Sequence, residues 1–155
     1  MNSVAIRVVG RSPSYKKPKN RYNWLKPSEI LNKMQSILQE KGAVSLGITY
    51  TMNLERFSPI SEVLLFADSM GDSFVYRARV KGIVNNYSLK ESIPGDFKEY
   101  ELPYWAGEPC SVWFLFDGLE LLSEEDIVCY ENAKGIPYSE VWKTPRYRVM
   151  YLTRN

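Results

Sequence analysis

The segment from residue 61 to residue 80 constrains the fold of this chain more than any other. Residues 63–66 form an uninterrupted apolar run, Gly71 and Asp72 are turn residues, and residues 74–80 form a second run. This order predicts a β-hairpin. The first arm lacks polar alternation, so we expect both of its faces to be covered, as in a small closed barrel. The second arm alternates, and its polar face carries the cations Arg77, Arg79 and Lys81.

Patterns in the rest of the chain predict one long helix and four further strands. Residues 27–41 carry an apolar stripe at helical spacing, begin with a proline and end before Gly42, which suits a helix C-terminus. We assign its apolar side chains to the core: Ile30, Leu31, Met34, Ile37 and Leu38. Ser123 precedes three acidic residues, which predicts a capped helical turn and not a metal site. The predicted strands are residues 4–9, 43–51, 111–122 and 147–153, and the predicted loops are residues 10–23, 82–99 and 133–145.

Length and charge place the chain among single-domain globular proteins. Its 155 residues suit one domain that spans residues 1–155. Residues 1–41 carry nine Lys or Arg against two Glu, whereas residues 42–135 carry seven basic residues against fifteen acidic ones. If the basic termini meet, they form a surface that suits phosphate, and an ordinary solvated surface is the alternative. With no long apolar segment and no signal-peptide pattern, we expect a cytoplasmic protein that does not enter membranes.

Several kinds of chemistry lack the residues that they need. Histidine is absent, which removes imidazole-activated nucleophiles and most zinc or iron ligand sets. Cys110 and Cys129 are two thiols without a secretory context, so we expect them to be unpaired. No phosphate-binding glycine loop of either common type occurs. The sequence therefore predicts binding and not catalysis, with no cofactor and no metal.

Aromatic residues make up 14% of the chain, and several lie in predicted loops. The loop at residues 10–23 mixes cations with tyrosines, and Trp24 follows it. Cations contact phosphates and flat rings stack on bases, with stacking worth roughly 1–3 kcal/mol per base. The alternative is that about half of these rings fill the core and that Trp24 packs under the helix.

The order of these elements resembles the YTH and EVE branch of the PUA-like superfamily. The likeness covers residues 4–127 as a pattern, and its strongest part is the hairpin EVLLFADS followed by SFVYRARV. It also includes KGAVSLG after the helix, YELPYW after the long loop, and SVWFLFDGLELLSEEDI. The resemblance implies an α+β fold, an open β-barrel of five to six strands with flanking helices. It also implies a domain that binds nucleic acid and holds a flipped, modified base in an aromatic pocket, where rings and hydrogen bonds offset the cost of unstacking.

The same resemblance indicates where the pocket lies. The family has an aromatic residue after the long loop, where this chain has YELPYW, and a Trp-Ser pair after the helix, where this chain has Val44 and Ser45. Because Val44 stands where the family has tryptophan, a ring from another part of the chain would have to take its place. The predicted pocket residues are Trp24, Ser45, Tyr50, Tyr100, Tyr104, Trp105 and Trp113. The predicted contacts to the nucleic-acid backbone are Arg7, Arg11, Lys16, Lys17, Lys19, Arg21, Arg77, Arg79 and Lys81.

Within the superfamily, restriction proteins of the McrB type carry such domains at the N-terminus of a GTP-driven AAA+ motor. The resemblance therefore implies a targeting domain for methylated DNA, fused to or assembled with such a motor and a nuclease subunit. N6-methyladenine is the favoured mark by analogy with YTH pockets, and 5-methylcytosine stays open. Two alternatives remain: an RNA-binding reader of modified RNA with the same fold, and an ASCH-type enzyme that acts on modified nucleosides.

Overall fold

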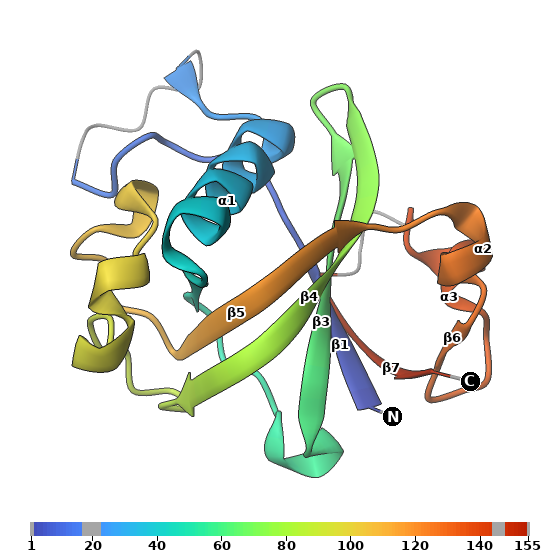
Figure 1. The fold of residues 1–155 in the computed structure, drawn as a ribbon. Coiled ribbons are helices and arrows are strands. Elements are labelled where there is room, and N and C mark those ends of the chain that lie inside the picture. Colours follow the sequence, from blue (N-terminus) through green and yellow to red (C-terminus); the bar gives the residue numbers. More distant parts are fainter. Residues whose placement is uncertain (1, 17–22, 144–147, 155) are drawn as a thin grey trace.

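The computed structural model describes residues 2–16, 23–143 and 148–154. They form an α+β fold in which helices flank one seven-stranded mixed sheet (Figure 1). The strands are β1 (Asn2–Arg7), β2 (Val44–Ile48), β3 (Ile60–Ser69), β4 (Asp72–Asn85), β5 (Val112–Leu121), β6 (Tyr130–Asn132) and β7 (Val149–Arg154). The helices are α1 (Pro27–Lys41), α2 (Glu124–Ile127) and α3 (Tyr138–Val141), with short 3₁₀ helices η2 (Glu55–Phe57), η3 (Gly95–Tyr100) and η4 (Pro103–Trp105).

The strands follow the order β2-β5-β4-β3-β1-β7-β6. β1 and β3 are parallel, and the other neighbouring pairs are antiparallel. The sheet is not closed into a barrel, because β2 and β6 each pair with one neighbour only among the described strands. The α+β class is confirmed, whereas the expected five to six strands are wrong. β7 pairs with the outer side of β1 and brings β6 with it, so the C-terminal strands extend the sheet.

The hairpin expected at residues 61–80 is confirmed as β3 and β4. Ser69 pairs with Asp72, and the two residues between them, Met70 and Gly71, both have positive φ, of 55° and 83°. Positive φ at both central residues is typical of the tight turn that joins twisted antiparallel strands. Residues 63–67 are fully buried, as their continuous apolar character predicts. The tip of the hairpin reaches the loop after β1, where a Cβ built on Gly10 would lie 2.3 Å from Met70 Sδ.

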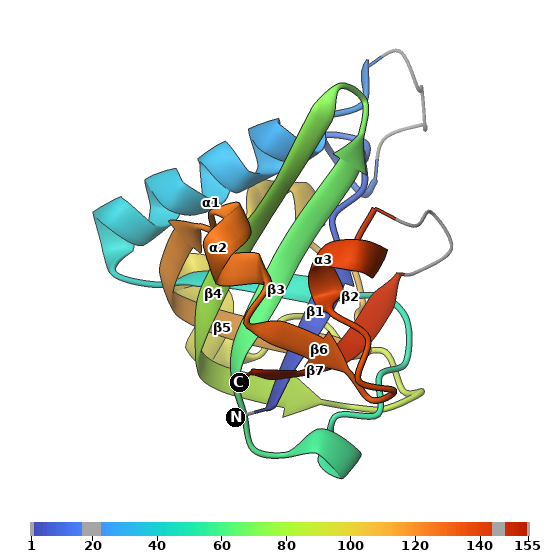
Figure 2. The same cartoon turned by 90° about the vertical axis from the view of Figure 1, so that its right-hand side faces the viewer.

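The two faces of β3 pack into two separate cores. Val63 and Leu65 belong to the larger core under α1, whereas Leu64 and Phe66 belong to a smaller one. The smaller core is covered by the C-terminal part of the chain, so α1 lies on one side of the sheet and α2 and α3 lie on the other (Figures 1 and 2). β3 is therefore a central strand with a hydrophobic layer on each side.

Helix α1 forms as predicted. It begins at Pro27, and Gly42 ends it in the left-handed conformation at φ 81°, with its N–H donating to Leu38 O. Of the five side chains assigned to the core, four are buried and Leu38 is half-buried. Ser123 also caps α2 as expected, because its hydroxyl accepts a hydrogen bond from the Asp126 N–H.

β4 runs on to Asn85, into the loop predicted at residues 82–99, and η3 also begins within that loop. Besides the 3₁₀ helices, two short elements were not expected from the sequence. β6 has three residues, and α3 lies inside a predicted loop. Each of them contains a buried tyrosine whose contact partner lies far away in the sequence. Tyr130 donates to buried Glu62 Oε1 at 2.7 Å, and Tyr138 packs edge-on against Phe66 with ring centroids 5.9 Å apart. Contacts of this kind override weak local propensity, which is why the local pattern did not indicate these elements.

Two searches of the described residues give negative results. No helix among them is long and apolar enough to cross a membrane. Within the same residues, no three or more Asp, Glu or Cys side chains are grouped so that they would hold a metal ion. Both cysteines are free thiols, Cys110 buried and Cys129 exposed.

Close packing at Gly47 gives a test of the larger core. A Cβ at this position would lie 2.6 Å from Cys110 Sγ and 2.7 Å from the Trp113 ring. We expect Gly47→Ala to lower the free energy of unfolding by about 1–3 kcal/mol, as measured by chemical denaturation, because the buried ring has to shift. Gly95→Ala is the matched control, since nothing lies within 4 Å of its Cβ position. Equal effects of the two substitutions would contradict this account.

Candidate functional site

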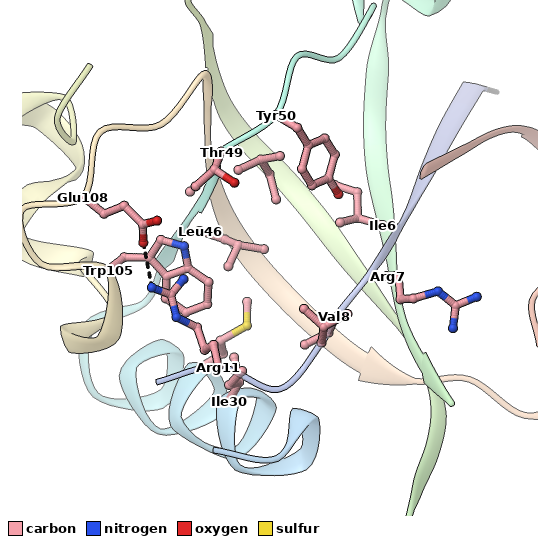
Figure 3. A pocket seen from close by; sticks show the side chains of 14 residues that line it. Ile6, Arg7, Val8, Arg11, Ile30, Leu46, Thr49, Tyr50, Trp105 and Glu108 are labelled. Carbon is pink, nitrogen blue, oxygen red and sulfur yellow. Dashed lines mark hydrogen bonds and ion pairs between the residues drawn. The ribbon is translucent and has the colours of Figure 1, made fainter. Parts of the chain in front are cut away.

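An apolar cavity opens on the α1 side of the sheet, and we call it the inner cavity (Figure 3). Its volume is about 160 Å³. A dry apolar cavity of roughly 150 Å³ is known to hold benzene, whereas drug-sized ligands need about 300–1,000 Å³. The inner cavity therefore suits one flat ring system. The side chains that form most of its wall are Ile6, Val8, Met34, Leu46, Tyr50 and Trp105.

Four separate segments form this wall. The end of β1 and the residues after it form one side, and Ile30 and Met34 of α1 face it from one turn apart. The third segment is β2 with the residues that follow it. The fourth is η4, where Pro103 starts a tight turn and the Trp105 N–H donates to Leu102 O at 3.1 Å. Because β1, α1, β2 and η4 each contribute residues to it, packed elements fix much of this wall.

An arginine covers one face of the aromatic wall. The Arg11 guanidinium lies 3.8 Å from the centroid of the Trp105 ring. Its Nη2 atom donates to Glu108 Oε1 at 2.6 Å (Figure 3). The same atom also donates to Tyr104 O at 3.0 Å. Backbone hydrogen bonds between Arg11 and Leu25 hold the residue in place. The Arg11 and Glu108 side chains are only 19% and 14% exposed, so this ion pair is shielded from water to a degree unusual for a surface pair.

A larger and more polar hollow adjoins the inner cavity, and we call it the outer groove. Its volume is about 590 Å³, and its own lining includes Ser12, Tyr15 and Trp24. Four residues line both spaces, namely Val9, Arg11, Thr49 and Glu108. The Arg11–Glu108 pair therefore lies at the boundary between the two. The Lys16 side chain is exposed and lies against Gly107, next to Glu108 in the chain.

Tyr50 forms the wall of the inner cavity near Ile6 (Figure 3). The Arg148 guanidinium lies over its ring at 5.1 Å from the centroid. Its hydroxyl group is buried and has no hydrogen-bond partner within the described residues. Burial raises the pKa of Tyr50 to about 12, although the nearby charge of Arg148 acts in the opposite direction.

The seven predicted pocket residues do not all meet at one place. Tyr50 and Trp105 line the inner cavity and Trp24 lines the outer groove, whereas Tyr104 contributes its backbone carbonyl. Two others are core residues outside either space. Ser45 is 1% exposed within β2, and Trp113 packs on Gly47 with its Nε1–H donating to Glu91 O at 2.9 Å. Tyr100 is half-buried against the larger core and lines neither space.

The predicted cations also separate. Arg7 points away from the inner cavity (Figure 3) and lies over the Phe66 ring at 4.7 Å, on the side of the smaller core. Arg77 pairs in register with Leu64, and Arg79 with Glu62, so both share that side. Glu120 and Asp117 already form ion pairs with them, at 2.6 Å and 2.7 Å. Lys81 is exposed on β4. Lys17, Lys19 and Arg21 lie outside the described residues.

Reasoning from sequence missed Glu108 and the apolar part of the wall. Met34 was assigned to the core, where it is buried, but the same side chain also lines the inner cavity. Glu108 follows Trp105 by three residues in a segment that Pro103 and Pro109 delimit. One signal could have identified Glu108: it is an acidic residue close in sequence to a predicted pocket ring, in a turn that brings the two together.

Comparison of the chain with protein-family models, with curated proteins and with solved structures gives no significant match. The function has to be inferred from the cavity, the groove and the ion pair between them.

The buried hydroxyl of Tyr50 predicts a pH dependence of stability. The folded state holds the phenol proton up to about pH 12, whereas the unfolded chain releases it above pH 10.0. The unfolded state thus gains about 1.4 kcal/mol per pH unit over this interval, and the wild type loses stability there. We expect Tyr50→Phe to lose less stability than the wild type between pH 10 and pH 12 in denaturant titrations. At pH 7, where the hydroxyl is neutral in both states, the two proteins should differ by at most about 1 kcal/mol.

Proposed function

We propose that this chain is a binding module for methylated DNA and that it holds one flipped, modified base in the inner cavity. The observation that carries the proposal is the Arg11 guanidinium, a flat group that lies on Trp105 at 3.8 Å. The face of this ring therefore already accepts one planar group, beside a cavity of about 160 Å³. Bases stack on aromatic side chains in the same way.

The neighbouring groove supports the same proposal. A flipped nucleotide brings its sugar and phosphates with it, so a base site needs an adjoining polar space. The outer groove provides this space, with Trp24 and Tyr15 in its lining and Lys16 near its rim. A base in the inner cavity and a backbone in the outer groove would pass the boundary formed by Arg11, Glu108 and Thr49.

The apolar wall favours a methylated base over its unmethylated form. Ile6, Val8 and Leu46 offer no hydrogen bonds from their side chains, so an added methyl group is buried at no polar cost. Each buried CH₂-sized group contributes about 0.8 kcal/mol, which is roughly a fourfold change in affinity. N6-methyladenine is the mark that we propose first, and 5-methylcytosine is the second.

The sequence resemblance is consistent with this position of the site. Its strongest motifs lie on β3 and β4, and the YELPYW segment contains η4 with Trp105. In this proposal the domain is PUA-like, of the YTH and EVE type, and targets a restriction complex to DNA. The AAA+ motor and the nuclease would then be other domains or partner subunits.

The direct test is a binding titration of the whole chain with short duplexes. Duplexes that carry N6-methyladenine, 5-methylcytosine or no methyl group are compared at one salt concentration, together with methylated RNA of the same sequence. We expect one methylated DNA duplex to bind at least about fourfold more tightly than the unmethylated one. Equal affinity for all DNA duplexes would contradict the proposal, and preference for the RNA would make the chain a reader of modified RNA.

Two equally buried tryptophans allow a matched comparison of roles. Trp105 and Trp142 are each 8% exposed, but Trp105 lines the inner cavity whereas Trp142 belongs to the smaller core. We expect Trp105→Ala to weaken binding of the methylated duplex by about 1–3 kcal/mol and to leave the salt dependence of binding nearly unchanged. Trp142→Ala removes a ring of the same size and exposure and should leave affinity unchanged at temperatures where the protein is folded.

Lys16→Ala should act in the opposite way, lowering the slope of log K against log salt by about one. The affinities of the wild type and of all three variants are measured by titration at several salt concentrations, and the folded fraction is checked by circular dichroism.

A loss of affinity in Trp142→Ala as large as that in Trp105→Ala would contradict a specific role for the inner cavity.

A further inference from the structure

The Arg11–Glu108 ion pair lies where a base would enter the inner cavity, so binding of a base would change its contacts. Glu108 Oε1 lies 2.6 Å from Arg11 Nη2, and the Arg11 guanidinium lies over the Trp105 ring at 3.8 Å from its centroid. Within the described residues, nothing accepts a hydrogen bond from the buried Arg11 Nε atom. Arg11 therefore covers the face of the Trp105 ring and forms an ion pair with Glu108, but its Nε–H has no acceptor among the described residues.

A base that stacks on this face of Trp105 has to take the place of the guanidinium. Arg11 also lines the outer groove, so its side chain has a polar space to move into. In the function proposed above, that space holds phosphate, which accepts from arginine as well as a carboxylate does. The cost of breaking the ion pair is thus offset for Arg11 by a new anionic partner.

Glu108 lines the same groove, but the phosphate that would occupy it is an anion and offers no donor to a carboxylate. Its side chain is 14% exposed, and a carboxylate that loses its partner at this burial is strongly destabilised. The incoming base must therefore bring an N–H donor to the position that Arg11 Nη2 leaves. Adenine and cytosine carry an exocyclic amine in the plane of the ring, and this N–H can donate to the carboxylate, whereas the ring nitrogen beside it only accepts. Both N6-methyladenine and 5-methylcytosine keep at least one N–H on that amine.

We propose that Glu108 selects the base: it exchanges Arg11 for the exocyclic N–H of a base stacked on Trp105. The inference rests on the proposed function and adds a class of ligand to it, namely bases with a primary or secondary exocyclic amine. Arg11 is then a resident competitor for the site. A base that fills the same volume without this N–H is rejected, because it leaves the carboxylate unpaired.

A pair of ligands that differ in one atom tests this selection. N6-methyl-2′-deoxyadenosine is compared with the 2′-deoxyriboside of 6-methoxypurine, in which an oxygen replaces the N–H and the methyl group is kept. Calorimetric titration of the whole chain should show the methoxy compound binding at least about tenfold more weakly, the usual loss for a hydrogen bond to a charged group. In Glu108→Gln the two compounds should bind within about threefold of each other, because an amide both donates and accepts.

Glu91→Gln is the control, because Glu91 is exposed and lines neither the inner cavity nor the outer groove. This variant should keep the wild-type discrimination. Arg11→Ala should bind the free N6-methyl nucleoside several times more tightly than the wild type, because the competing guanidinium is gone. Weaker binding in Arg11→Ala would overturn the exchange, as would equal binding of the two nucleosides by the wild type.

The outcomes separate this inference from the proposed function. A preference for methylated duplexes without discrimination between the two nucleosides leaves the function standing and overturns the role of Glu108. Discrimination that depends on Glu108, together with equal binding of methylated and unmethylated duplexes, supports the role of Glu108 and overturns the function. Absence of binding by every nucleoside and duplex overturns both.

Discussion

The burial of β3 on both faces is the constraint on which the rest of this structure depends. Its residues 63–67 have no exposed surface, so the sheet needs a hydrophobic layer on each side. α1 supplies one layer, and the C-terminal segment from α2 to β7 supplies the other. Glu62, at the start of the same strand, is 5% exposed and accepts hydrogen bonds from Ser3 at 2.8 Å and from Tyr130 at 2.7 Å. This buried carboxylate thereby ties β1 and the C-terminal layer to β3.

The position of the candidate site follows from the partner of β3. β1 runs parallel to it, and the Val8 N–H beyond β1 still donates to Phe66 O at 2.7 Å. The chain thus stays next to β3 just past the end of the strand, and Arg11 then contacts Trp105 of the larger core. β2, at the edge of the sheet, lies across from it and contains Gly47, which lets the Trp113 ring approach the backbone. The inner cavity is the space between these two segments, with α1 and η4 completing the wall.

The sequence predicted what depends on local pattern, and it failed where a contact joins distant segments. The hairpin, α1 with its Gly42 end, and the cap at Ser123 each have their signals within a few residues, and all three are confirmed. The seven-stranded sheet was missed because β6 forms around buried Tyr130, whose partner Glu62 is 68 residues away. For the site, aromatic character identified Tyr50 and Trp105, but it could not distinguish them from Trp113, which is a core residue. Basic character alone also grouped Arg77 with Arg11, although they lie at different parts of the sheet.

The Arg11–Glu108 pair is hard to explain as a device for stability. A shielded ion pair loses most of its attraction to desolvation, and apolar side chains of similar volume often replace such a pair without loss. Ile30 and Leu46 show that this part of the core readily accepts apolar residues. Arg11 lies over Trp105, and both members of the pair lie at the boundary between the inner cavity and the outer groove. This arrangement suits groups that exchange partners. In the exchange that we propose, both charged side chains keep a hydrogen-bonding partner before and after binding, which an apolar substitute at either position would not allow.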